Sequence, residues 1–237
     1  MSEQKPSGSL AVRKMFSSIA ARYDLLNRLF SFGTDVRWRR ELASEIPEAG
    51  NHPILDVATG TADVALTMEE VCAGDRLIVG TDFTLPMLRV GSNKISDNRS
   101  QRIRLTAGDA YSLPFKENTF DAVTIAFGLR NLAHRVEGLR EMARVLIPGG
   151  RVVILEFSPM NRPVLGPLFR FYFHRIMPFL GGIISGDRGA YLYLPESVDQ
   201  FPDPLGLGQE MMEAGFTEVK YRALTMGIAY LHVGVKP

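Results

Sequence analysis

Short apolar runs alternate with stretches of helical spacing between residues 53 and 157, and this alternation constrains the fold more than any other feature of the chain. The apolar runs lie at residues 53–55, 76–82, 103–108, 120–126 and 151–157. Strands that alternate with helices in this way form βαβ units, whose strands are parallel. With 237 residues, of which 46% are hydrophobic, the chain can bury a full core. We expect one α/β domain over residues 1–237, with a doubly wound and mostly parallel sheet.

Further segments flank this alternating part. Residues 10–46 have helical spacing with a break near residues 31–33, which predicts an N-terminal helical cap. The helix at residues 136–147 should stop at Pro148-Gly149-Gly150, because proline removes a donor and glycine relaxes the turn. Residues 158–204 break the alternation and predict an insertion that forms a lid. After a helix at residues 205–214, strands at 218–224 and 228–235 are joined by too few residues for a crossover, so they should be antiparallel.

The turn after the first strand is built from small residues, Asp56-Val57-Ala58-Thr59-Gly60-Thr61-Ala62-Asp63. A strand that runs through a tight turn into a helix presents free backbone N–H groups to a ligand. The segment resembles the acidic-x-Gly-x-Gly-x-Gly loop of S-adenosylmethionine methyltransferases, with Ala58 and Ala62 in place of the outer glycines. It does not have the G-x-G-x-x-G spacing of dinucleotide-binding folds. Taken alone, such a turn can also serve only tight packing.

Three successive predicted strands carry an aspartate at or near their carboxyl ends, namely Asp56, Asp82 and Asp109. In open α/β sheets, ligands bind outside the carboxyl ends of the strands, so these side chains should converge on one crevice. The two oxygens of Asp82 could accept both hydroxyls of a ribose. Helix capping explains any one of these residues, but it explains all three poorly. The pattern therefore predicts a nucleotide-like cofactor in the crevice.

Composition argues against several other classes of protein. The net charge of +1 provides no strong field for nucleic acid, so we expect no nucleic-acid partner. The single cysteine, Cys72, excludes an internal disulfide and suits a reducing compartment. The four histidines are widely spaced, so we expect no metal. No signal peptide is recognisable at the N-terminus, and we expect a cytoplasmic protein.

Longer motifs resemble one known family over nearly the whole chain, the ubiquinone/menaquinone biosynthesis C-methyltransferases. The motifs are Tyr23-Asp24-Leu25-Leu26-Asn27, Ser31, Trp38, Phe127-Gly128-Leu129-Arg130-Asn131, Arg144-Val145-Leu146-Ile147-Pro148-Gly149-Gly150, Leu155-Glu156-Phe157-Ser158, Tyr193-Leu194-Pro195-Glu196-Ser197 and Leu231-His232-Val233-Gly234-Val235-Lys236. The chain departs from the family at Asp35, where His is frequent, and at Ile147, where a basic residue is frequent. Ala126 stands where the family often has Ser, and Ala62 where it often has Gly.

The resemblance implies a Rossmann-like class I methyltransferase sheet with a C-terminal antiparallel hairpin, and S-adenosylmethionine as the cofactor. It assigns the cofactor to Thr61, Asp82, Asp109 and Ala110, with Gly60 and Asp56 in the same set. Thr61 offers a hydroxyl and an N–H at a helix start, Asp82 suits the ribose, and Asp109 with Ala110 suits the adenine edge. Gly60 allows close approach of the backbone. Ala126 lacks the hydroxyl that the family often has, so no contact is assigned to it.

The resemblance also implies methyl transfer to a ring carbon of a prenylated quinol, from demethylmenaquinol to menaquinol. A phenol with a pKa of about 10 is mostly neutral near pH 7, so the protein must stabilise the phenolate. Arg130 is the candidate for this task, although a guanidinium cannot be the base. Tyr23, Asp24, Asn27 and Asn131 could orient the quinol and a proton-accepting water, and Tyr193 is a weaker candidate. Each also has a structural interpretation: Tyr23 in the core, Asn131 as a helix cap, Arg130 in an ion pair.

The apolar segment 163–184 contains Arg170, His174, Arg175 and Pro178, which argue against a spanning helix. It predicts either a lid helix packed in the core or an entrance for an isoprenoid tail, in transient contact with the inner membrane surface.

Alternative methyl acceptors are a benzoquinol of ubiquinone biosynthesis or another phenolic or lipid molecule. A catalytically silent subunit with this fold is the alternative outside enzymes. The sequence leaves open whether the chain forms a homodimer.

Overall fold

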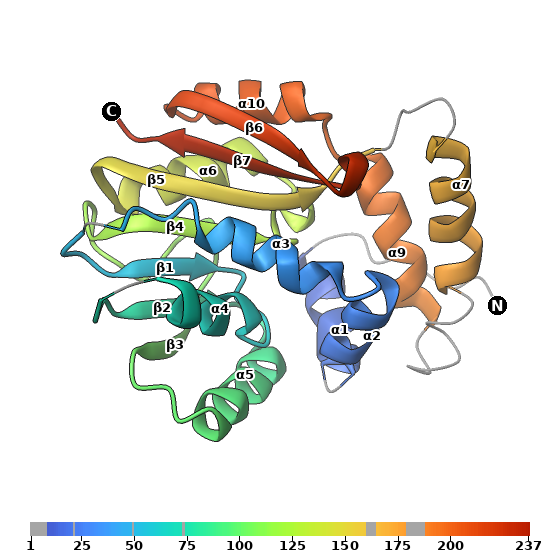
Figure 1. The fold of residues 1–237 in the computed structure, drawn as a ribbon, viewed down its shortest axis with the longest axis horizontal. Helices are drawn as coiled ribbons and strands as arrows, with labels where there is room; N and C mark the ends of the chain where they lie inside the picture. The colour runs from blue at the N-terminus through green and yellow to red at the C-terminus, as the bar shows by residue number, and fades with distance from the viewer. Residues whose placement is uncertain (1–8, 21, 49, 73, 160–164, 179–187) are drawn as a thin grey trace.

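A seven-stranded sheet forms the centre of the computed structural model, which describes residues 9–20, 22–48, 50–72, 74–159, 165–178 and 188–237. The strand order is β3-β2-β1-β4-β5-β7-β6 (Figure 1). The strands are β1 (Ile54–Val57), β2 (Ile78–Asp82), β3 (Ile103–Ala107), β4 (Phe120–Ala126), β5 (Leu146–Phe157), β6 (Thr217–Leu224) and β7 (Ala229–Val235). The first five pair in parallel, and β7 is antiparallel to both β5 and β6. This confirms the predicted sheet and its terminal hairpin.

Helices cover both faces of the sheet. One face carries α3 (Thr34–Ala43), α4 (Asp63–Val71) and α5 (Leu85–Asp97), and the other carries α6 (Arg135–Val145) and α10 (Pro204–Glu213). Because side chains alternate along a strand, Ile54 of β1 packs toward the first face and Leu55 toward the second. The carboxyl ends of the parallel strands therefore form one sheet edge, with helices packed above and below.

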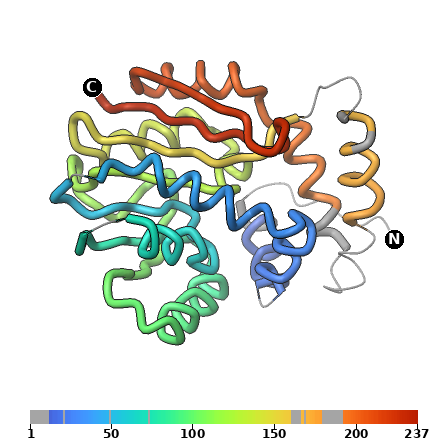
Figure 2. The backbone as a smooth tube through the Cα atoms, in the orientation of Figure 1, coloured from blue at the N-terminus to red at the C-terminus, as the bar shows by residue number. Residues whose placement is uncertain are grey.

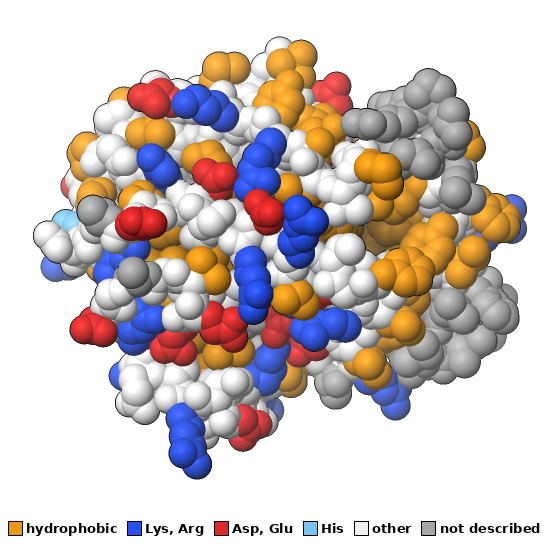
Figure 3. Space-filling model, viewed as in Figure 1, with side chains coloured by type: hydrophobic (Ala, Val, Ile, Leu, Met, Phe, Trp, Pro, Cys, Tyr) orange, Lys and Arg blue, Asp and Glu red, His pale blue; other side chains and the backbone are white. Residues whose placement is uncertain are grey.

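Additional helices gather at this carboxyl edge (Figures 1 and 2). They are α1 (Ser9–Ile19), α2 (Tyr23–Phe30), α7 (Leu165–Phe171), the π-helical turn η2 (Tyr172–Ile176) and α9 (Arg188–Asp199). Helix α1 contacts α5 and α9. In Figure 3, hydrophobic side chains surround a hollow at this end of the molecule. Parts of the predicted lid, residues 160–164 and 179–187, lie outside the described residues.

The N-terminal cap is interrupted twice, whereas the sequence predicted one break. The predicted break near residues 31–33 is present between α2 and α3, where Gly33 has a φ of 75°. The additional break precedes Tyr23 and separates α1 from α2. It turns α2 so that Leu26 is buried while Leu25 and Leu29 remain exposed.

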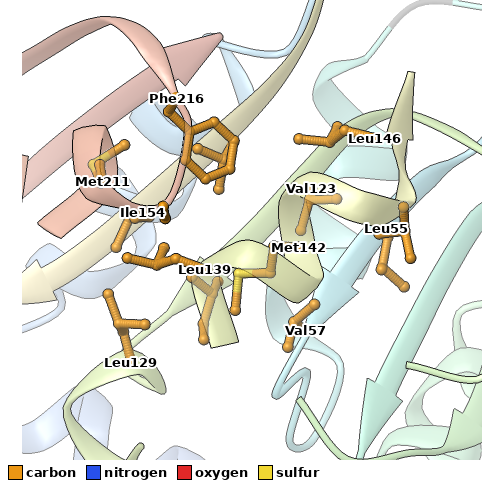
Figure 4. Close-up of a cluster of buried hydrophobic side chains, with 14 of the residues drawn as sticks. Leu55, Val57, Val123, Leu129, Leu139, Met142, Leu146, Ile154, Met211 and Phe216 are labelled. Atoms are coloured by element: carbon orange, nitrogen blue, oxygen red, sulfur yellow. The ribbon is translucent and has the colours of Figure 1, made fainter. Parts of the chain in front are cut away.

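The core on the α6 and α10 side is drawn in Figure 4. Leu55, Val123 and Ile154 project from adjacent strands toward Leu139 and Met142 of α6. All five side chains are fully buried, and each such side chain contributes about 1.5–3 kcal/mol to stability. This packing fixes the strands, and with them the loops at their carboxyl ends.

Strand β5 begins earlier than predicted. The expected start was Arg151, after Pro148-Gly149-Gly150, but those three residues lie inside β5. Phe120 of β4 pairs with Leu146 and Ala122 pairs with Arg151, so the residues between are accommodated as a bulge. Gly149, with a φ of 77°, provides the bend. The irregularity lies at the amino end of β5, far from the carboxyl edge.

Candidate functional site

A first cavity lies beyond the carboxyl ends of β1, β2, β3 and β4 and encloses about 940 Å³ of space, part of it open to solvent. Its wall consists of Val12, Phe16, Tyr23, Val57, Ala58, Gly60, Thr81, Asp82, Phe83, Thr84, Met87, Gly108, Asp109, Ala110, Tyr111, Ala126, Phe127, Gly128, Asn131 and Leu132. Four residues predicted to bind the cofactor, Gly60, Asp82, Asp109 and Ala110, are among them.

The loop between β1 and α4 shapes one side of this cavity. Ala58, Gly60 and Ala62 all have positive φ values, of 53°, 55° and 67°. Alanine rarely adopts this conformation, so the two alanines carry strain at the positions where the family pattern has glycine. The turn is tight enough to bring the Gly60 N–H to the Oδ2 of Asp82, at 2.9 Å.

The Asp82 carboxylate is held at the end of β2 by two backbone donors. Its Oδ2 accepts from Gly60, and its Oδ1 accepts from the N–H of Thr84 at 2.7 Å. Burial raises the pKa of Asp82, and these two hydrogen bonds act in the opposite direction. A carboxylate has about four acceptor sites, so both oxygens retain capacity toward the cavity.

Two other loops complete the wall. Asp109 follows β3, and its Oδ1 accepts from the N–H of Tyr111 at 3.0 Å. After β4, a Cβ on Gly128 would lie 2.7 Å from the Cβ of Ala58, so the loops after β1 and β4 touch here only because residue 128 is glycine. Ala58 and Gly128 both line the first cavity, so this close approach forms part of its wall.

Asp56 and Thr61 lie behind the cavity wall rather than on it. Asp56 is fully buried, and its Oδ1 accepts from the hydroxyl of Thr124 at 2.7 Å. Burial is the main reason that the pKa of Asp56 rises to about 7. The hydroxyl of Thr61 donates to Asp24 at 2.5 Å. The Thr61 hydroxyl and the Oδ1 of Asp56 are thus bonded to protein groups, and the role of both residues toward the cofactor stays a prediction.

A second cavity of about 1140 Å³ adjoins the first. It is mostly apolar, and its wall consists of Met15, Phe16, Ile19, Tyr23, Asn27, Phe30, Ser31, Phe32, Thr34, Asp35, Trp38, Arg39, Phe127, Arg130, Phe157, Phe173, Met177, Tyr193, Leu194, Thr225 and Ile228. Phe16, Tyr23 and Phe127 line both cavities. The two spaces therefore meet at these three side chains.

Arg130 enters the second cavity from the short helix η1 (Leu129–Asn131), as half of a buried ion pair. Its Nη1 lies 2.6 Å from Oε1 of Glu156 and also donates to the Phe127 carbonyl at 2.6 Å. The side chains of Arg130 and Glu156 are 5% and 1% exposed. The ion-pair interpretation of Arg130 is thus confirmed, yet its Nε has no partner among the described residues.

Sequence reasoning missed Glu156. The signal was present, because Glu156 is an acid near the end of the apolar strand β5, as Asp82 is in β2. Its Oε2 accepts the backbone N–H of Arg130 at 3.2 Å, and its Oε1 accepts that of Phe157 at 3.0 Å. Glu156 therefore fixes both the backbone and the guanidinium of Arg130.

The remaining predicted catalytic residues are divided between the two cavities. Tyr23 lies at their junction, and its pKa is raised mainly by burial, against the lowering effects of Arg130 and of a hydrogen bond with Asn27. Asn27 lines the second cavity and Asn131 the first. The Oδ1 of Asn131 accepts from the hydroxyl of Tyr193 at 3.0 Å.

Asp24 lines neither cavity and belongs to an ionic cluster that the sequence did not reveal. Its Oδ2 lies 2.8 Å from Nζ of Lys94, which also contacts Asp63. Arg39 in turn bridges Asp63 and Asp35, at 3.4 Å and 2.8 Å. The cluster connects α2 and α3 to α4 and α5.

Comparison with known proteins agrees with this geometry. The sequence model of the ubiE/COQ5 methyltransferase family matches residues 2–236. The chain belongs to the ubiE/COQ5 methyltransferase family. It is 52% identical to a demethylmenaquinone methyltransferase of Thermus thermophilus, over 94% of this chain and 100% of the relative. It is 50% identical to that of Deinococcus radiodurans, over 95% of this chain and 92% of the relative.

Solved structures with the same fold include the [4+2]-cyclase SpnF, with a TM-score of 0.72 and 18% identity over 100% of this chain and 99% of that chain. A possible histamine N-methyltransferase from Thermotoga maritima has a TM-score of 0.66 and 14% identity, over 94% and 100% of the two chains. These likenesses show the fold. As a member of the ubiE/COQ5 methyltransferase family, the chain is an S-adenosylmethionine-dependent methyltransferase, as predicted.

Proposed function

We propose that this enzyme transfers a methyl group from S-adenosylmethionine to a ring carbon of a prenylated quinol, converting demethylmenaquinol to menaquinol. The observation that carries the proposal is the meeting of the two cavities at Phe16, Tyr23 and Phe127. One cavity has carboxylates suited to a nucleoside, and the other is apolar with a buried arginine. The names of the relatives in Thermus thermophilus and Deinococcus radiodurans support the same reaction.

The first cavity fits the cofactor. The free acceptor sites of Asp82 would take the ribose hydroxyls, and Asp109 with Ala110 would take the adenine edge. Gly60 lets the backbone approach closely, while Asp56 and Thr61 would hold the loop from behind. When bound, the sulfonium of the cofactor supplies an electrophilic methyl group.

In the second cavity, Arg130 would stabilise the quinolate. Its Nη1 is held by Glu156, so the buried guanidinium would present a fixed positive charge to the quinol oxygen beside the acceptor carbon. Because the site is buried, a fixed donor favours the ionised oxygen more strongly than water would. The ionised oxygen raises electron density on the ring carbon, which gains the methyl group and loses its proton to water.

Tyr23 would orient the ring rather than act as the base. The raised pKa of Tyr23 keeps its hydroxyl protonated near neutral pH, so it serves as a hydrogen-bond donor at the junction. Asn27 on the second cavity and the Asn131–Tyr193 pair would complete the polar rim. Asp24 lies outside the cavity wall and would position Thr61, whose hydroxyl donates to it.

The isoprenoid tail would leave through the apolar mouth of the second cavity. Phe32 lines this cavity and is 79% exposed, and its ring lies 5.8 Å from that of Tyr172 in η2. Leu25, Leu29 and Phe171 are exposed on the neighbouring helices. Within the described ranges, no helix is long and apolar enough to cross a membrane. We infer a peripheral contact of this end with the inner membrane surface.

Mass analysis of quinones in cells that lack this protein tests the function. A quinone without one ring methyl group should accumulate, and an unchanged quinone profile would exclude the proposed reaction. A benzoquinol is the second candidate, because relatives at 43–47% identity are named for both ubiquinone and menaquinone biosynthesis. The ring system of the accumulating quinone, naphthoquinone or benzoquinone, distinguishes the two candidate substrates. Cofactor binding without turnover on either quinol would instead support a silent subunit.

A further inference from the structure

One lysine connects the N-terminal cap to the cofactor loop, residues 58–62 between β1 and α4, and the mechanism above does not use it. Lys94 of α5 donates to Oδ2 of Asp24 in α2 at 2.8 Å, and it also contacts Asp63, the first residue of α4. Its Nζ lies 3.4 Å from the hydroxyl oxygen of Thr61, which itself donates to Asp24 at 2.5 Å. Lys94 therefore contacts the cap, the loop and the helix that follows the loop.

The Lys94 ammonium is fully used by these contacts. An ammonium has three donors, and Lys94 has three acceptors, on Asp24, Asp63 and Thr61. The side chains of Lys94 and Asp63 are only 25% and 24% exposed, so solvent screens their attraction incompletely. Arg39 holds the other oxygen of Asp63, at 3.4 Å. The position of Asp63 is thus fixed from two sides.

The contacts of Lys94 flank a strained residue. Thr61 and Asp63 come directly before and after Ala62, whose φ is 67° and whose side chain is fully buried. A residue with a Cβ is disfavoured in this left-handed conformation, and it persists there only where its surroundings hold it. The Ala62 N–H also donates to the Thr59 carbonyl at 2.9 Å, which closes the turn. The strained turn is therefore clamped on both sides of Ala62.

The same turn shapes the cofactor cavity. Gly60 precedes Thr61, and its N–H donates to Asp82 at 2.9 Å. Gly60 and Asp82 both line the first cavity. A loop that relaxed at Ala62 would carry the Gly60 N–H away from Asp82 and change the wall of the cavity. Lys94 can thus act on the cofactor without lining its cavity.

We propose that Lys94 is a positioning residue for the cofactor, which keeps the cofactor loop in its strained conformation by fixing Thr61 and Asp63 on either side of Ala62. The proposal rests on the proposed placement of S-adenosylmethionine in the first cavity, and it is independent of the methyl acceptor. The family often has glycine where Ala62 stands, and glycine adopts a positive φ without strain. Lys94 therefore offsets the strain of an alanine at a position that suits glycine.

Calorimetric titration with S-adenosylmethionine tests the proposal in a double-mutant cycle. Lys94→Met removes the ammonium but keeps a good helix former, and it should raise the Kd about tenfold, the factor expected when one residue is released from a strained conformation. Ala62→Gly should restore most of this loss in the Lys94→Met background and change the Kd much less in the parent. A lysine that served only overall stability would give no such rescue, because each Kd is measured on folded protein.

Arg89→Met is the matched control, because Arg89 is exposed on the same helix and the substitution removes the same charge. It should leave the Kd unchanged. If Lys94→Met fails to fold, Lys94→Gln keeps a polar side chain and carries the same prediction. Equal Kd values for the parent and the Lys94 variant, or an equal effect of Ala62→Gly in both backgrounds, would overturn the role of Lys94. An Asp82→Asn variant that binds the cofactor as tightly as the parent would instead refute its placement in the first cavity.

Discussion

Asp56 shows at the scale of one residue why a carboxylate near a strand end need not face the ligand. Asp56 lies inside β1, beside Thr124 of β4, whereas Asp82 is the last residue of β2 and reaches the cavity. The sequence places both near strand ends, so Gly60, Asp82, Asp109 and Ala110 could be predicted to line the crevice. It could not distinguish Asp56, because one position along a strand decides which way a side chain points.

Asp56→Asn should change how stability depends on pH. The pKa of Asp56 rises from 3.8 to about 7 on folding, so the folded protein binds this proton more strongly than the unfolded chain. Stability is therefore lost as pH rises from about 4 to about 7. Asparagine mimics the protonated form, so the variant should match the parent near pH 4 and exceed it by about 4 kcal/mol above pH 7.

Denaturant unfolding of both proteins at several pH values measures this difference. Titrations of other groups are common to the two proteins and cancel. A constant offset between the two curves would mean that Asp56 is ionised throughout this range in the folded protein.

Arg130→Gln tests whether the buried arginine serves chemistry or only the fold. The substitution removes a preorganised donor, and methyl transfer should slow by about 10²–10³ while cofactor affinity barely changes. It also leaves Glu156 buried without a counter-charge, which costs about 3–5 kcal/mol of stability. The joint variant Arg130→Gln with Glu156→Gln should recover stability and stay slow in single-turnover assays. Parental rates in that stable joint variant would make Arg130 a structural residue.

At the scale of elements, the strands and the terminal hairpin were predictable because apolar periodicity and a three-residue connection leave few alternatives. The second break in the cap, before Tyr23, was not predictable, since residues 10–30 keep helical spacing across it. Tertiary contacts hold the cap helices in place. Lys94 of α5 reaches Asp24 of α2 and Asp63 of α4, and no local pattern places three such distant charges together.

Lys94→Met should loosen the cap. The ammonium is 25% exposed, so part of its interaction with Asp24 and Asp63 is screened by solvent, and the loss should be about 1 kcal/mol of unfolding free energy. The denaturant midpoint measures it, and the effect should shrink at high salt. Lys116→Met, at an exposed position in the loop before β4, is the control and should leave the midpoint unchanged. Equal midpoints for the parent and Lys94→Met would show that the ionic cluster does not stabilise the cap.

At the scale of the molecule, the second cavity could not be derived from the sequence. Its wall combines α1, α2, α3, the segment after β4, the end of β5, η2, α9 and the turn between β6 and β7, which only the folded chain brings together. The motifs 23–27 and 127–131 indicated which residues matter, but not that Phe16 and Phe127 would close the junction. The exposure of apolar side chains on α2 could not be predicted either, because helical spacing does not show which side chains of a helix remain exposed to solvent.

These uncovered side chains give the last prediction. Leu25 and Leu29 are four residues apart on α2, are 63% and 46% exposed, and line neither cavity. The double variant Leu25→Gln with Leu29→Gln keeps good helix formers and should weaken binding to phospholipid vesicles by about tenfold or more, from lost apolar burial. Co-sedimentation with vesicles measures it, while turnover of a short-chain quinol in solution should be unchanged. Leu205→Gln is the matched control, since Leu205 is 58% exposed on α10, on the opposite face of the sheet from α3. Vesicle binding that is insensitive to the α2 variant, or equally reduced by Leu205→Gln, would mean that the mouth of the second cavity does not face the membrane.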